Sequence, residues 1–148
     1  MKLRSMKTFK PLLVVFGWAV STAALTLGTI FLGYLLPRDI NGGGLYSEIL
    51  NASPVPLWIF YVGNFAICVL AAFVISDLSA TIVSFFPSFV GAAGIAYVVL
   101  ALPDLLGCCG GVLEESAIGF VLVAFFPRLF IVNLAGTFVG AVLEERFP

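Results

Sequence analysis

The sequence predicts an all-α, polytopic membrane protein with four transmembrane helices. Of the 148 residues, 61% are hydrophobic and only 10% are charged, and the mean hydropathy is +1.17. A water-soluble domain of this length could not bury so much apolar surface, so lipid must cover it. The apolar residues form long runs, and a helix needs ~20 of them to cross the hydrocarbon core. The length suits a single helical transmembrane domain, residues 1–148.

The first apolar run, about residues 11–36, predicts the first transmembrane helix. Four of the seven basic residues of the chain precede it: Lys2, Arg4, Lys7 and Lys10. Cytoplasmic flanks are enriched in Lys and Arg, so we expect a multi-pass protein of the cell membrane with a cytoplasmic amino terminus. The run is longer than the ~7–15 apolar residues of a signal peptide, so we expect it to be retained.

The second and third helices are predicted at about residues 55–76 and 80–102. The tight turn Asp77-Leu78-Ser79 joins them into an antiparallel hairpin, with Ser79 as the expected N-cap of the third helix. Pro103-Asp104 is expected to end that helix. The glycine-rich segment at residues 107–111 then predicts a loop or the start of a re-entrant piece.

The last apolar run, about residues 117–143, permits two interpretations. As one helix it would be ~40 Å long, against a hydrocarbon core of ~30 Å. Pro127 and Arg128 lie near its middle, and proline removes a backbone hydrogen bond and kinks a helix. The run is therefore either one long, kinked helix or two half-helices that meet at Pro127, which would make five helices in all. We favour the kinked helix.

Each predicted helix carries small or polar residues at helical spacing. Helices in lipid associate through close backbone packing and interhelical hydrogen bonds, which small residues permit. We therefore expect these stripes to lie where helices meet, and the alternative is that they line a pore or substrate path. The helix-packing residues predicted in this way are Gly17, Ser21 and Gly28, then Cys68, Gly91, Gly136 and Gly140.

Four polar residues of the apolar part of the chain are candidates for function: Arg128, Asn64, Asn133 and Glu114. An unsatisfied amide in hydrocarbon costs several kcal/mol, so each asparagine is expected either to hydrogen-bond across the bundle or to contact a ligand or ion. A central arginine costs about 2.5–3.5 kcal/mol to insert. Arg128 should therefore face a partner or a water-filled cavity, unless a break at Pro127 lets it reach the headgroups.

Neither a catalytic nor a metal-binding pattern is visible. The chain has three cysteines and no histidine, and no spacing suggests a metal cluster. No nucleophile–base pair, phosphate loop or carboxylate pair lies in the apolar runs. We expect no enzyme activity, no cofactor and no nucleic-acid partner.

Two stretches resemble the stage II sporulation protein M family. They are Phe60-Tyr61-Val62-Gly63-Asn64-Phe65-Ala66-Ile67, and Leu102-Pro103-Asp104 followed by Gly111-Val112-Leu113-Glu114-Glu115-Ser116-Ala117-Ile118. The matching positions are Asn64, Pro103 and Glu114, within a resemblance that covers Ile49 to Leu129. The chain departs from the family pattern in lacking a histidine before the glycine and in having Gly63 where the asparagine is commonly doubled. The resemblance implies a multi-span helical protein without demonstrated catalysis, in a family linked in spore-forming bacteria to a peptidoglycan-remodelling complex as its membrane scaffold.

These observations predict a non-enzymatic membrane scaffold or accessory subunit that associates with other membrane proteins in the bilayer. The stripes of small residues on all four helices also predict an oligomer. The alternative is a small oligomeric channel or transporter for an anion or small solute, with Arg128, Asn64 and Asn133 along its path.

Overall fold

The protein is described here by a computed structural model that covers residues 3–32, 36–37, 49–50, 54–75, 77–107 and 112–146. Side chains are described for residues 12–32, 57–75, 77–107 and 116–146. The five helices are α1 (Leu3–Phe31), α2 (Pro54–Ile75), α3 (Leu78–Leu105), α4 (Val112–Phe125) and α5 (Arg128–Arg146). Two short antiparallel strands, β1 (Leu36–Pro37) and β2 (Ile49–Leu50), pair Leu36 with Leu50 and Pro37 with Ile49.

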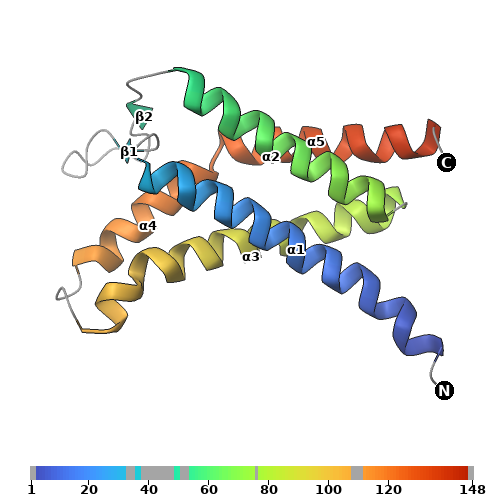
Figure 1. Ribbon diagram of the computed structural model, residues 1–148, viewed down its shortest axis with the longest axis horizontal. Coiled ribbons are helices and arrows are strands. Elements are labelled where there is room, and N and C mark those ends of the chain that lie inside the picture. The colour runs from blue at the N-terminus through green and yellow to red at the C-terminus, as the bar shows by residue number, and fades with distance from the viewer. Residues whose placement is uncertain are drawn as a thin grey trace.

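The helices form a bundle in which α1 lies across both α2 and α3 (Figure 1). The amino-terminal end of α1, the α2–α3 turn and the carboxyl end of α5 lie at one end of the bundle (Figure 1). We call this the terminal end, and the other the distal end. α4 packs beside α3, and α5 packs beside α2.

Three helices are long and apolar enough to cross a membrane: Leu12–Phe31, Leu57–Ile75 and Leu78–Leu105. The pair of α4 and α5 would make a fourth span if the two count as one. Large apolar side chains are turned outward on these helices, for example Ile59 at 62% exposure, Leu70 at 66% and Val90 at 68%. An outer surface of this kind suits lipid, so the prediction of an all-α chain with membrane-spanning character is confirmed.

The first helix differs from the prediction at both ends. α1 begins at Leu3, so Pro11 lies inside the helix instead of starting it. The helix ends at Phe31. Just beyond it, the Leu32 N–H donates a hydrogen bond to the Gly28 carbonyl at 3.0 Å. The expected extension to residue 36 is wrong, because Leu36 belongs to β1. The predicted connection at residues 38–48 and the cysteine pair at 108–109 lie outside the described residues.

Asp77, and not Ser79, is the N-cap of α3. The backbone at Asp77 is extended, and its carboxylate accepts from the Ser79 N–H at 2.8 Å and from the Ala80 N–H at 3.4 Å. A carboxylate serves better than the expected serine hydroxyl here, because it carries a negative charge at the positive end of the helix dipole.

Replacing Asp77 with alanine should destabilise the α2–α3 hairpin by about 1 kcal/mol, since two N–H groups lose their acceptor. Thermal unfolding in detergent would measure this, with Ser79→Ala as the matched control. Asp77→Asn should recover most of the loss because asparagine also caps helices. A larger effect from Ser79→Ala than from Asp77→Ala would contradict the assignment.

Pro103 does not end α3, contrary to the prediction, because the helix continues to Leu105. The stop is made by Gly107, whose φ of +79° is a left-handed conformation that glycine adopts without steric cost. The Leu106 N–H still bonds the Leu102 carbonyl at 3.0 Å, and the Gly107 N–H bonds the Asp104 carbonyl at 2.8 Å. A proline in the last turn loses one bond but does not unwind it.

The last apolar run is two helices, so the favoured interpretation of one kinked helix is wrong. α4 ends with the Phe126 N–H bonded to the Leu122 carbonyl at 2.9 Å, and α5 begins with the Ile131 N–H bonded to the Pro127 carbonyl at 3.2 Å. Pro127 has no backbone N–H, so the helical hydrogen-bond pattern is interrupted at the junction. The two axes differ by 41°, which leaves both helices running in broadly the same direction.

Candidate functional site

α2 and α5 meet along the predicted small-residue stripes, and these stripes bring their backbones very close together. A Cβ added at Gly140 would lie 2.6 Å from the Val69 carbonyl oxygen and 2.7 Å from the Ala72 Cβ. A Cβ at Gly136 would lie 2.9 Å from the Phe65 carbonyl oxygen and 3.0 Å from the Cys68 Cβ. Residue numbers rise together along the contact, so the two helices run parallel. The structure therefore places Cys68, Gly136 and Gly140 in one interhelical seam.

The polar side chains of this seam are fully buried. Asn64 and Cys68 are 0% exposed, Asn133 is 1% and Thr137 is 0%. The Cys68 thiol lies in hydrogen-bonding contact with the Trp18 indole and the Thr137 hydroxyl, and the latter donates to the Asn133 carbonyl at 2.7 Å. The seam is thus a packed polar contact that also reaches α1 through Trp18.

The Asn64 amide does not hydrogen-bond across the bundle, contrary to expectation. Its Nδ2 donates to the Phe60 carbonyl of its own helix at 3.0 Å. Among the described residues, no donor reaches Asn64 Oδ1, Asn133 Oδ1 or Thr22 Oγ1, all of which are buried. A buried oxygen of this kind destabilises the fold by about 1–3 kcal/mol, and none of these three oxygens links two helices through a hydrogen bond.

Phenylalanine rings fill the region where α3, α4 and α5 meet. Phe89 of α3 lies 5.4 Å from Phe125 and 5.4 Å from Phe130 between ring centroids, with tilted or edge-on geometry. Phe85 lies 6.0 Å from Trp18 and 5.6 Å from Phe130. These rings close the side of the bundle next to the α4–α5 break.

α1 crosses α3 with both chains running in the same general direction, and the two helices meet at small side chains. The Ser88 hydroxyl donates to the Ser84 carbonyl at 2.7 Å and lies 3.3 Å from the Val15 carbonyl of α1. A Cβ at Gly91 would lie 3.4 Å from the Ala19 Cβ, an ordinary contact. The predicted packing residue Gly91 is therefore at the α1–α3 contact, although it is less tightly enclosed than Gly140.

The predicted stripe of α1 faces away from the bundle. Gly17, Ser21, Ala24 and Gly28 are all exposed, and a Cβ added at Gly17 or Gly28 would meet no atom within 4 Å. We call these four residues the outward face of α1. As packing residues within the chain, Gly17, Ser21 and Gly28 were predicted wrongly. The buried face carries Trp18, Thr22, Thr26 and Thr29, and two of these threonines bond carbonyls four residues earlier in α1.

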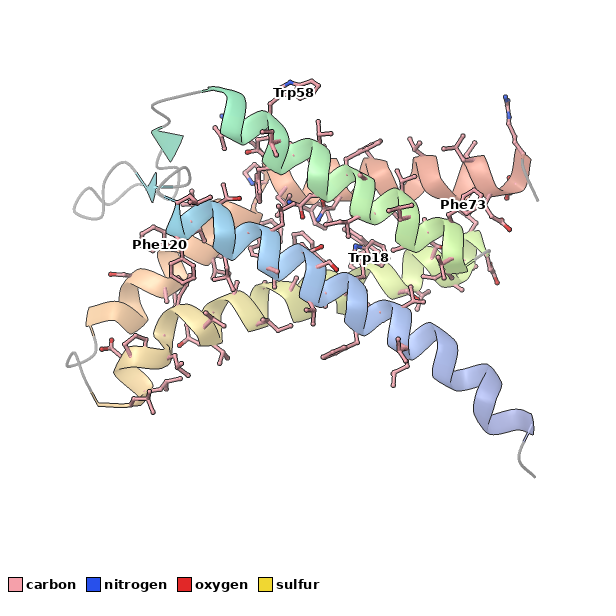
Figure 2. The ribbon with its side chains drawn as sticks, viewed as in Figure 1. Trp18, Trp58, Phe73 and Phe120 are labelled. Carbon is pink, nitrogen blue, oxygen red and sulfur yellow. The ribbon has the colours of Figure 1, made fainter. Side chains whose placement is uncertain are left out.

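Two apolar grooves flank the outward face of α1. The groove between α1 and α3 has a volume of about 520 Å³ and includes Phe16, Ala19, Pro87 and Gly91 in its lining. The groove between α1 and α2 has a volume of about 300 Å³, and Ala24 and Gly28 of the outward face line it together with Ile59 and Phe60. In Figure 2 the ribbon of α1 lies in front of the other helices, with Trp18 directed into the bundle.

Arg128 lies on the surface of the bundle and not in its interior. Its side chain is exposed, and the guanidinium hydrogen-bonds the hydroxyl of Tyr61 on α2. Tyr61 lies seven residues after the start of α2 at Pro54, which is ~10 Å along the helix axis. Arg128 is central in the apolar run but stands at the distal end of the shorter helix α5. The run breaks immediately before Arg128, which is the arrangement of two half-helices that the sequence left open.

The structure does not bring the candidate functional residues into one site. Asn64 and Asn133 are buried in the α2–α5 seam, Arg128 is exposed on the bundle surface, and the side chain of Glu114 lies outside the described ones. The sequence did not predict the threonine face of α1 or Tyr61 as the partner of Arg128. The spacing 18, 22, 26 and 29 is also helical, so two stripes compete on α1 and periodicity alone does not choose between them.

The described residues contain no cluster of His, Cys, Asp or Glu that could hold a metal ion. Comparisons with protein-family models, with curated proteins and with solved structures found no match to this chain. The resemblance to the stage II sporulation protein M family therefore stays a prediction from two short motifs. The described residues offer a packed interior, an outward face of small residues on α1 and an exposed arginine.

Proposed function

We propose that the protein is a non-enzymatic scaffold or accessory subunit of the cell membrane, which associates with another membrane protein through the outward face of α1. It crosses the bilayer four times, with α4 and α5 as one broken span and the terminal end in the cytoplasm. α4 alone is ~21 Å long and too short to cross the ~30 Å core. Because α5 continues in broadly the same direction, the two together cross once.

The observation that carries the proposal is the position of the small residues of α1. A helix that faces lipid gains nothing from glycine and serine, which leave its backbone polar groups poorly covered. α2 and α3 instead direct Leu70, Val74, Val83 and Val90 outward, each at least 64% exposed. Small residues permit close approach of a second helix, and on α1 that helix is not supplied by the described part of the chain.

The interior favours association over transport. Gly136 and Gly140 hold α5 against α2 at backbone contact, and the Phe85–Phe89 rings fill the adjoining side. Arg128 is exposed whereas Asn64 and Asn133 are buried in a packed contact, which does not favour a path along these three residues within one chain.

Replacing Gly17 and Gly28 together with leucine should abolish association and leave the fold intact, because each position opens onto free space. The loss should exceed tenfold in the fraction of protein recovered in complex, since large side chains hold helix backbones apart. The measurement is the mass of the particle extracted in mild detergent or in lipid nanodiscs. Helicity and thermal unfolding would be recorded in parallel.

The matched control is Gly94→Leu, because Gly94 on α3 is equally exposed and also meets no atom within 4 Å. It should leave association unchanged. A strictly monomeric wild-type particle without any partner would contradict the proposal, and so would an equal loss of association in the Gly94 control.

A further inference from the structure

Three buried oxygen atoms that have no hydrogen-bond partner among the described residues come from three different helices. They are Thr22 Oγ1 on α1, Asn64 Oδ1 on α2 and Asn133 Oδ1 on α5. All three side chains are at most 1% exposed. Buried polar groups in folded proteins are almost always hydrogen-bonded, so each of these atoms calls for a partner.

The three side chains lie in one layer of the bundle, next to the contact that the Cys68 thiol makes with Trp18 and Thr137. Each of them stands four positions from a member of this contact: Thr22 from Trp18, Asn64 from Cys68 and Asn133 from Thr137. Residues four apart lie on the same face of a helix, about one turn from each other. We call Thr22, Asn64 and Asn133 the polar layer.

The three steps away from the contact lead in the same direction. α5 runs parallel to α2, and Asn64 and Asn133 both come earlier in their helices than the contact. α1 runs antiparallel to α2, because Cys68 contacts Trp18 whereas a Cβ added at Gly63 would meet Leu25 at 2.8 Å. Thr22 comes later in α1 than the contact, so the whole polar layer lies one turn from it toward the distal end (Figure 1).

The free atoms of the polar layer are two acceptors and one hydroxyl. The Nδ2 of Asn64 donates to the Phe60 carbonyl, which fixes the orientation of the amide and leaves Oδ1 on its free side. The Oδ1 of Asn133 is likewise an acceptor only. Thr26 donates its hydroxyl proton to the carbonyl four residues earlier in α1, whereas the Thr22 hydroxyl makes no such bond. The proton of Thr22 is therefore available to a ligand.

We propose that the polar layer binds one water molecule, which donates to Asn64 Oδ1 and Asn133 Oδ1 and accepts from the Thr22 hydroxyl. A buried water makes about three hydrogen bonds, and here two acceptors and one donor match its two protons and a lone pair. The water links α1 to the α2–α5 seam and so fixes which face of α1 is turned outward. This site does not depend on association through that outward face.

A water molecule suits the polar layer better than a metal ion. The three side chains carry no charge, and an unpaired ion is far more costly to bury than a neutral molecule. On the side of α3, Gly91 meets Ala19 of α1, and both helices run in the same general direction. Ala92 and Ala96, both fully buried, therefore lie near the level of Thr22. Their methyl groups leave more space beside the layer than larger apolar side chains would.

Thr22→Val tests the water through the sign of its effect on stability. Valine has the shape of threonine without the hydroxyl, so the variant takes one hydrogen-bond partner from the water. The unfolding equilibrium constant should then rise about tenfold, because a buried polar group is left without a bond. Without a water, removal of an unpaired buried hydroxyl leaves stability unchanged or increases it. Denaturant unfolding of the whole protein in detergent measures the change.

The matched control is Thr81→Val. Thr81 is 0% exposed, and its Oγ1 also has no partner among the described residues, but it lies near the start of α3 and outside the polar layer. This variant should be as stable as the wild type or more stable. Replacement of sodium and potassium by choline should leave the stability of the wild type unchanged, since choline is too large to take the place of a buried metal ion.

Solid-state NMR of the protein in lipid bilayers detects the water directly. Magnetisation from water protons should reach the side-chain amides of Asn64 and Asn133 faster than the backbone amide of Ala72, which is equally buried on α2. Equal rates of transfer, or a Thr22→Val variant at least as stable as the wild type, would overturn the inference. Loss of stability in choline would assign the polar layer to a metal ion and would overturn it as well.

Discussion

Replacing Gly140 with alanine should destabilise the bundle by about 1–3 kcal/mol, the usual cost of adding atoms to a packed contact. The new methyl group would meet the Val69 carbonyl oxygen at 2.6 Å and the Ala72 Cβ at 2.7 Å. Both neighbours lie on a helix backbone or next to it, so no flexible side chain can move aside. α2 and α5 must separate, and the polar seam between them must open. Thermal or denaturant unfolding in detergent would measure the loss.

The control for Gly140→Ala is Gly119→Ala on α4, where an added Cβ meets nothing within 4 Å. That substitution should be neutral or stabilise the helix by up to about 1 kcal/mol, because alanine is the better helix former. Gly136→Ala should resemble Gly140→Ala, since its nearest neighbour is the Phe65 carbonyl oxygen at 2.9 Å. Equal stability of the Gly140 and Gly119 variants would show that α2 and α5 are not in backbone contact.

Replacing Phe89 with alanine should cost about 3 kcal/mol, at the lower end of the range for a buried phenylalanine. Its ring is 6% exposed and contacts the rings of Phe85, Phe125, Phe126 and Phe130. The buried ring has little contact with lipid, so the free-energy cost comes from the cavity and from the lost contacts between rings. Because Phe89 bridges both sides of the α4–α5 break, the variant should also loosen the junction.

Unfolding of Phe89→Ala would be compared with that of Phe138→Ala, because Phe138 on α5 is 45% exposed. The control should lose less than about 1 kcal/mol, as surface substitutions usually do. Hydrogen exchange at residues 122–131 should rise only in the Phe89 variant. If both variants unfold alike, the aromatic cluster is not what holds the broken span to α3.

The helices were predictable because their apolar runs are long and separated by proline, glycine or charge. The ends of the helices were not, because local signals compete there. Pro103 indicated a stop, yet the bonds made by Leu106 and Gly107 carry α3 beyond it. Asp77 and Ser79 are both good capping residues, and only the backbone conformation at Asp77 decides between them.

The outer surface of the bundle was predicted less well than the interior seam. Sequence spacing identifies a stripe of small residues, but it does not say whether the stripe faces the same chain or another one. On α5, Gly136 and Gly140 face α2, whereas on α1 the glycines face outward and the threonines face inward. Periodicity also did not reveal the break at Pro127, after which Arg128 begins α5.

Photocrosslinking from the outward face of α1 in native membranes would decide whether a protein covers it. A benzophenone side chain placed at Ser21 should give protein adducts, while the same group at Val90, which is 68% exposed on α3, should give adducts with lipid alone. Lipid adducts alone from position 21, or protein adducts in equal yield from both positions, would contradict a scaffold that associates through α1.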